Sequence, residues 1–284
     1  MGGHEGLDKR AVGPGPGAAD RRPALEAVRR AYPLTVEMVL AAAVVALWQL
    51  ARVPFEVPAD EAIAAARDLM SLERALGVMV EPDMVRWLAG YPALLDAANW
   101  FYSHMDETLV FAGLATLRLL DPVRYPAIRT AFVLTHVPAL LAVAAYPAAP
   151  PRWVPGFPFG SPPAFDLGGD LRNSTAAAVS LHVGIPVLLA AAAIWVRPRS
   201  RLAWATVLFP ALVLAVVVGT GNHLVIDAAI GAACAVAGAG GAALIHGRPA
   251  RGRPQAGALG IAAAAVVWGA LAFAASSVVV AAWG

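Results

Sequence analysis

Long apolar runs separated by short polar segments dominate this sequence. Seven of them have about the 20 residues that an α-helix needs to cross a bilayer core of about 30 Å. The second run fits least well, because Asp106 and Glu107 stand near its start. We therefore expect an all-α integral membrane fold, a polytopic helical bundle of six or seven transmembrane helices. The runs span roughly residues 34–52, 102–120, 127–147, 175–196, 202–220, 223–245 and 257–281.

Two polar stretches stand apart from these runs. Residues 1–33 are rich in glycine and proline and then in arginine, and we expect a largely disordered, basic, cytoplasmic segment there. Residues 34–284 then form the membrane domain. In residues 57–78 charged residues alternate with isoleucine, leucine and methionine, as in an amphipathic helix at the membrane interface. That helix is either a lid over a lipid site or a connector resting on the bundle, and we favour the connector.

The composition agrees with a membrane protein and excludes an ordinary soluble domain. Hydrophobic residues make up 59% of the 284 residues and charged residues 14%, whereas soluble domains have about 45–50% apolar and about 25% charged residues. The single cysteine, Cys234, cannot form an intramolecular disulfide. The net charge of +2 identifies no partner, so the placement of the charges is more informative.

The arginines predict the orientation of the chain. If residues 1–33 are cytoplasmic, the connections after the second, fourth and sixth runs are cytoplasmic as well. These connections hold most of the arginines near the runs, as the positive-inside rule requires. The runs that start near residues 175 and 223 then begin at the outer face. The arginines in question are Arg118, Arg124, Arg129, Arg197, Arg199, Arg201, Arg248, Arg251 and Arg253.

Ionisable residues within membrane spans are rare and usually functional. We give most weight to His182, His223 and Asp227, and less to His104, Asp106, Glu107 and His136. On a helix, His223 and Asp227 share one face, so the carboxylate can fix one imidazole nitrogen and leave the other to react. The plainer interpretation is a polar pair that packs two helices. The predicted orientation brings Ser180, His182 and Arg152 to the same surface. Because arginine side chains and helix amino termini both bind phosphate well, we expect a phosphoryl site.

Three segments carry a resemblance to a known family. They are Tyr146-Pro-Ala-Ala-Pro-Pro-Arg152, Ser180-Leu-His-Val-Gly184 and Thr220-Gly-Asn-His-Leu-Val-Ile-Asp227. Leu72-Glu-Arg-Ala-Leu-Gly-Val78 and Asn99-Trp-Phe-Tyr102 add to it. In this order they resemble the type 2 phosphatidic acid phosphatase superfamily, and more closely its branch related to inositol phosphorylceramide synthase. The likeness covers about residues 70–240, within a motif core at about 70–245.

The resemblance implies a role for each matching residue. His223 matches the nucleophile that forms a phosphohistidine, Asp227 the carboxylate that orients it, and His182 the general acid that protonates the leaving oxygen. Ser180 and Arg152 match groups that bind the phosphate. The resemblance implies no metal and no other cofactor.

This site has fewer basic residues than the pattern of the broad superfamily. Ala145 stands where the broad pattern has a lysine, seven residues before Arg152. Val217 stands where the broad pattern has an arginine, six residues before the histidine. We expect Arg172 or the amide of Asn222 to compensate as a substrate-binding group.

These observations predict a lipid-phosphate phosphatase or phosphotransferase in the bacterial plasma membrane, with its site on the extracytoplasmic side. The expected partners are a membrane lipid phosphate and, for a transferase, an alcohol acceptor such as inositol or a sugar; no nucleic acid is expected. The alternative from another class is a non-catalytic lipid transporter or membrane assembly subunit that kept the fold. The sequence gives no prediction of oligomeric state.

Overall fold

The computed structural model describes residues 33–158 and 175–247, except for the side chains of residues 105–107. The secondary structure of these residues is entirely helical, apart from one isolated bridge between Ala148 and Ala176. The predicted span at 257–281 and the segment 1–32 lie outside the described residues. The α-helices are α2 (Leu34–Arg52), α3 (Ala59–Leu76), α4 (Glu81–Ala89), α5 (Pro92–Leu120), α6 (Tyr125–Ala145), α7 (Leu181–Val196), α8 (Arg201–Ala205), α9 (Leu208–Gly219) and α10 (Val225–His246), and short 3-10 turns occupy η1 (Val53–Phe55) and η2 (Pro151–Trp153).

Four helical stretches in the described part of the chain are long and apolar enough to cross a membrane. They are Leu34–Phe55, Tyr125–Ala145, Arg201–Gly219 and Val225–His246, and they coincide with four of the predicted runs. Two other predicted runs contain shorter apolar helices, Thr108–Leu120 and Leu181–Val196. These helices identify the chain as a membrane-embedded protein.

The run predicted at 175–196 is shorter as a helix because residues 175–180 pair with other segments. The Ala177 amide donates to the Ala148 carbonyl at 2.9 Å, and the Ser180 amide donates to the Asp227 carbonyl at 3.0 Å. The helix α7 therefore begins only after Ser180, its N-cap residue. This extended approach brings the chain along the first turn of α10, where the polar residues gather.

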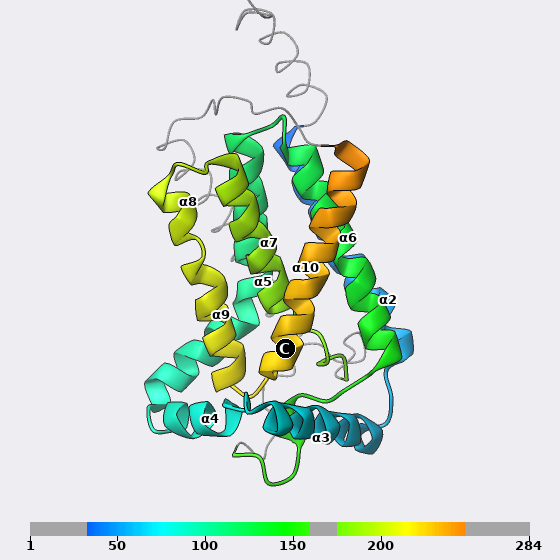
Figure 1. Cartoon of the computed structure of the whole chain (residues 1–284), viewed down its shortest axis with the longest axis vertical. Helices are drawn as coiled ribbons and strands as arrows, with labels where there is room; N and C mark the ends of the chain where they lie inside the picture. Colours follow the sequence, from blue (N-terminus) through cyan, green and yellow to red (C-terminus); the bar gives the residue numbers. More distant parts are fainter. Residues whose placement is uncertain (1–32, 159–174, 248–284) are drawn as a thin grey trace, which may run out of the picture. The chain divides into compact units, whose positions relative to one another are not determined.

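Helix α10 packs against both α6 and α7, with α2 beside α6 and α9 beside α7 (Figure 1). Small residues make the close packing of α10 feasible. A Cβ atom added to Gly231 would lie 2.0 Å from the Ser180 carbonyl oxygen, and one added to Gly238 would lie 2.4 Å from the Thr135 hydroxyl. Such small residues let helix backbones approach closely in membranes. The close crossing fixes the position of α7 relative to the start of α10.

Helices α3 and α4 lie across the end of the bundle where α10 begins (Figure 1). The apolar side of α3, formed by Ala62, Ala66 and Met70, packs against the segment after α6 and against Leu224. This is the helix predicted at 57–78. It rests on the turn that leads into α10, so its position bears directly on that turn.

Some of the arginines that predicted the orientation lie in buried ion pairs and not in open loops. Arg129 donates to both carboxylate oxygens of Glu37, at 3.0 and 3.1 Å, and Glu37 is only 3% exposed. Arg124 pairs with Asp121 at 3.1 Å, and both residues are buried. These arginines therefore have a structural role in addition to any influence on orientation.

Candidate active site

His223 lies in the turn between α9 and α10 and is 5% exposed. The turn passes through Gly221, whose φ of +67° is in the left-handed region that favours glycine. The Nδ1 atom of His223 lies 3.0 Å from the carbonyl oxygen of Ala177. A carbonyl only accepts hydrogen bonds, so Nδ1 carries the proton of the neutral ring. The Nε2 atom is then unprotonated and has a lone pair for attack.

Asp227 holds the start of α10 more directly than it holds His223. Its Oδ2 atom accepts a 2.7 Å hydrogen bond from the amide of Leu224, the N-cap residue of α10. The distance from Oδ2 to His223 Nδ1 is 3.6 Å, longer than a hydrogen bond. The sequence predicted His223 and Asp227 on one helical face, but His223 precedes the helix, and for this reason the two side chains are close without being directly bonded.

His182 lies in the first turn of α7 and faces His223 across the site. The centroids of the two imidazole rings are 5.5 Å apart. On its other side His182 stacks on the ring of Tyr102 from α5, with centroids 4.5 Å apart and planes 23° from parallel. The structure therefore brings together the two histidines that the sequence singled out, and it adds an aromatic support from Tyr102.

Two buried polar side chains near the histidines have unused hydrogen-bonding capacity. Ser180 is fully buried, and its hydroxyl has no hydrogen-bond partner among the described residues. Asn222 donates from Nδ2 to the Thr220 hydroxyl at 2.6 Å, while its Oδ1 atom has no partner within the described part of the chain. Because buried polar groups are normally satisfied, these two suit contact with a polar ligand.

Arg152 reaches this region from η2. Its amide donates to the Gly221 carbonyl at 3.1 Å, and its Cβ atom would lie 3.2 Å from a Cβ added to Gly221. The side chain is half-buried. The structure therefore places Arg152, the last residue of the first family-like segment, next to the turn that carries His223. Arg172, the other expected cation, lies outside the described residues.

A family model described as "PAP2 superfamily" matches residues 67–241. This range covers more than half of the chain and contains all of the site residues just described. The chain belongs to the PAP2 superfamily. Membership indicates a phosphatase-type or phosphotransferase function. No curated protein and no solved structure matches the chain.

Two glutamates in this PAP2 protein lie closer to the site than the sequence indicated. Glu73 of α3 and Glu81 of α4 are both 0% exposed. Glu73 Oε1 accepts from the Ile226 amide at 2.7 Å, and Glu81 Oε1 accepts from the Val225 amide at 2.8 Å. The sequence interpretation counted Glu73 among the charged, polar positions of an amphipathic helix. Its place three residues after Met70, on the buried side of α3, is the signal that could have revealed its burial.

The electrostatic surroundings of Glu73 favour its neutral form. The pKa of Glu73 is raised to about 7, chiefly by burial; the carboxyls of Glu81 and Asp227 also raise it, and the hydrogen bond from the Ile226 amide opposes them. Such a shift is the expected response of clustered, desolvated acids.

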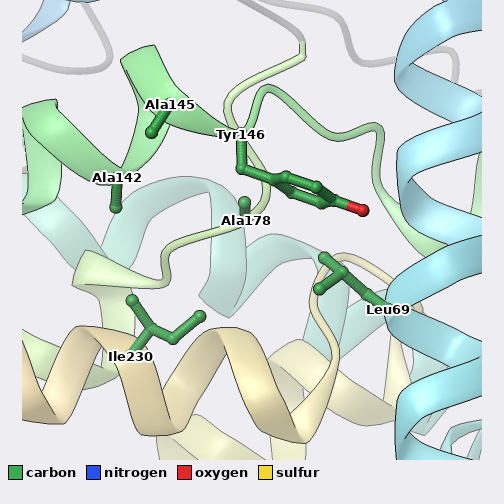
Figure 2. Close-up of a pocket in the computed structure, with 6 residues that line it drawn as sticks. All are labelled: Leu69, Ala142, Ala145, Tyr146, Ala178 and Ile230. Atoms are coloured by element: carbon green, nitrogen blue, oxygen red, sulfur yellow. The ribbon is translucent and has the colours of Figure 1, made fainter.

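An apolar cavity of 210 Å³ lies between α3, α6, α10 and the segment before α7 (Figure 2). Ala178, whose side chain faces the cavity, directly follows Ala177, the hydrogen-bond partner of His223. Ile230, on the opposite wall, is one helical turn beyond Asp227. Ala145, the position of the lysine of the broad pattern, also lines this cavity. An apolar surface therefore stands at that position. The lining residues are Leu69, Ala142, Ala145, Tyr146, Ala178 and Ile230.

Proposed function

We propose that this protein transfers the phosphoryl group of a membrane lipid phosphate through a phosphohistidine at His223. The observation that carries the proposal is the pair of facing imidazoles, with His223 Nδ1 bound to a carbonyl and Nε2 left to react. Membership in the PAP2 superfamily supports the same reaction class. A histidine fixed at one nitrogen is a suitable nucleophile at neutral pH.

The proposed reaction has two steps. In the first, Nε2 of His223 attacks phosphorus, the bond from phosphorus to the lipid oxygen breaks, and protonated His182 gives its proton to that oxygen. In the second, the acceptor oxygen attacks phosphorus, the N–P bond breaks, and His182 takes the proton of the acceptor. Asp227 assists by fixing the turn that carries His223, and the Ala177 carbonyl holds the ring. Positioning and charge stabilisation supply most of the benefit in such reactions.

The phosphate would be held by Arg152 together with the unsatisfied groups of Ser180 and Asn222. Ser180 lies at the amino terminus of α7, where unpaired amides and the helix dipole favour an anion. The guanidinium group of Arg152 would supply the positive charge. Arg172 remains a further candidate for the same role.

The hydrocarbon chain of the lipid would occupy the cavity beside Ala178. Its lining is apolar, and it lies between α6 and α10, two of the helices long enough to cross a membrane. A lipid whose headgroup meets His223 can then keep its chain out of water. The substrate class is therefore a phosphorylated lipid rather than a soluble phosphate ester.

The proposed setting is the plasma membrane, with the amino terminus in the cytoplasm and the site at the extracytoplasmic face. The arrangement would use six or seven spans, counting the two shorter apolar helices and the predicted run at 257–281. The arginine distribution supports this orientation.

The acceptor is water for a phosphatase, and an inositol or sugar hydroxyl for a transferase. A specific observation also favours a non-catalytic lipid transporter or assembly subunit as the second candidate. The positions of the two missing cations, Ala145 and Val217, lie in an apolar cavity and in the core, so fewer charges are available to neutralise a phosphoryl group.

The test is phosphate release by purified protein from a panel of lipid phosphates, with and without inositol. We expect release, or transfer to the alcohol, that is lost in His223→Ala and kept in His246→Ala, a matched histidine at the opposite end of α10. Mass spectrometry at alkaline pH should detect a phosphorylated His223. Equal signals from wild type and His223→Ala would refute the nucleophile, and lipid binding without turnover would favour the transporter.

A further inference from the structure

Three carboxyl groups from three different helices converge on the first turn of α10. Asp227 accepts from the amide of Leu224, Glu81 from that of Val225, and Glu73 from that of Ile226, at 2.7, 2.8 and 2.7 Å. The first amides of a helix have no partners within the helix. Here three consecutive ones are satisfied by buried carboxyls, and this turn directly follows His223.

Glu73 and Glu81 reach this turn from α3 and α4, two successive helices that lie across the end of the bundle where α10 begins (Figure 1). Helix α3 ends at Leu76 and is capped by Gly77, whose φ is +68°, and α4 begins at Glu81. Both carboxyls are 0% exposed, and the second oxygen of each, Oε2, has no partner within the described part of the chain. Each carboxyl thus uses one oxygen for α10 and leaves one polar atom buried.

Two buried carboxylates side by side cannot both be charged at low cost. A single proton between them removes one charge and satisfies atoms that otherwise have no partner. Each group keeps an acceptor oxygen for its amide in this form. The groups that face Glu73 are Glu81 from α4 and Asp227 from α10, and both are acidic.

We propose that Glu73 and Glu81 are positioning residues that share one proton and anchor the first turn of α10, and with it Asp227 and His223. Only the expected effect of these residues on turnover rests on the proposed function. The anchoring itself is a property of the fold. Neither residue touches the reacting atoms in this scheme, and both act through the backbone of Val225 and Ile226.

The proton also gives the site a pH dependence. Below about pH 7, the value to which burial and the neighbouring acids raise the pKa of Glu73, one proton leaves the pair with a single negative charge. Above that pH a second negative charge develops beside Asp227 and opposes an anionic substrate. We therefore expect turnover to fall on the alkaline side of the profile, in a step that depends on these two residues.

The test compares substitutions that keep or remove the acceptor oxygen. Glu73→Gln and Glu81→Gln keep an oxygen for the amides of Ile226 and Val225 and can donate in place of the shared proton. Glu73→Leu and Glu81→Leu cannot. The control is Glu61→Leu, an exposed glutamate on the same helix α3. Two readouts are needed: steady-state kinetics across pH 5–9, and amide hydrogen exchange of residues 224–228 in detergent.

We expect the leucine variants to lose about 100-fold in kcat with little change in KM, because a misplacement of about 1 Å has an effect of that size. The same variants should exchange the amides of Val225 and Ile226 faster. The glutamine variants should keep kcat at pH 6 and protected amides, and Glu73→Gln should lose the alkaline step. Glu61→Leu should behave as wild type in both readouts.

The proposal is wrong if the leucine variants retain wild-type kcat and exchange, or if glutamine is as damaging as leucine. It is also wrong if the pH profile of Glu73→Gln superimposes on that of wild type. If a leucine variant does not fold, the glutamine variants and their pH profiles still decide. If wild type proves inactive on every substrate, the exchange data test the anchoring while the proposed function fails by itself.

Discussion

Replacing Gly231 by alanine tests whether the active site depends on the close crossing of α7 and α10. The added Cβ would lie 2.0 Å from the Ser180 carbonyl oxygen and 2.8 Å from its carbonyl carbon. The reciprocal contact is nearly as tight, since a Cβ on Gly184 would lie 2.5 Å from the Gly231 carbonyl oxygen. All of the clashing atoms are backbone, so no side-chain rotation can relieve them.

The magnitude follows from these distances. Real Cβ atoms essentially never approach another heavy atom closer than 3.0 Å, so Ser180 and Gly231 must separate by about 1 Å. That movement carries His182 away from His223 and strains the bond between the Ser180 amide and the Asp227 carbonyl. Overpacking of this kind costs about 1–3 kcal/mol of stability, and a displacement of about 1 Å at a catalytic group can cost about 100-fold in rate.

The assay is phosphate release from the best lipid substrate, paired with thermal denaturation in detergent. Gly240→Ala is the matched control, because it lies on the same helix and an added Cβ would meet nothing within 4 Å. We expect Gly231→Ala to lose activity by about 100-fold and Gly240→Ala to keep it. Wild-type activity and melting temperature in Gly231→Ala would refute the argument that the crossing sets the distance between the two histidines.

Three further predictions concern charge and the lipid cavity. Glu37→Gln should lower stability by about 3 kcal/mol, because the buried Arg118 and the half-buried Arg129 both lose a buried carboxylate partner; an unchanged melting temperature would contradict this. Because burial raises the pKa of Glu73 from 4.5 to about 7, the folded state holds a proton that the unfolded state loses. The free energy of unfolding should therefore fall by about 3 kcal/mol as pH rises through that window, and pH-dependent melting of Glu73→Gln should lack this slope. Ile230→Trp should reduce turnover of long-chain but not of short-chain lipid phosphates. The control Val236→Trp, on the exposed side of α10, should leave both unchanged. Equal loss of turnover on both chain lengths in Ile230→Trp would show that the cavity does not hold the lipid chain.

The sequence predicted the helical runs well because membrane crossing depends on local composition. The spans expected at 34–52, 127–147, 202–220 and 223–245 overlap the four helical stretches long and apolar enough to cross, with ends that differ by only a few residues. The run at 175–196 was predicted too long, because the bonds of residues 175–180 to Ala148 and Asp227 are non-local. Hydropathy alone cannot distinguish an apolar strand-like approach from the first turns of a helix.

The candidate site was predictable only where side chains carry the chemistry. His182 and His223 could be singled out as ionisable residues in apolar runs, and the structure brings them together. The partner of His223 could not be found in this way, since it is the backbone carbonyl of Ala177, which any residue type could supply. The burial of Glu73 was missed because a charged residue at the edge of an amphipathic pattern normally faces water.

The low positive charge of this site and its buried acids are two parts of one electrostatic problem. A phosphoryl group needs neutralising charge, but Ala145 and Val217 supply none and their surroundings are apolar. Three ionised carboxylates around the start of α10 would also cancel its favourable dipole. Sharing a proton between Glu73 and Glu81 removes part of that negative charge while keeping the hydrogen bonds that place His223. On this reasoning, Arg152 and the helix termini are sufficient for an anionic substrate only as long as the glutamate pair keeps its proton.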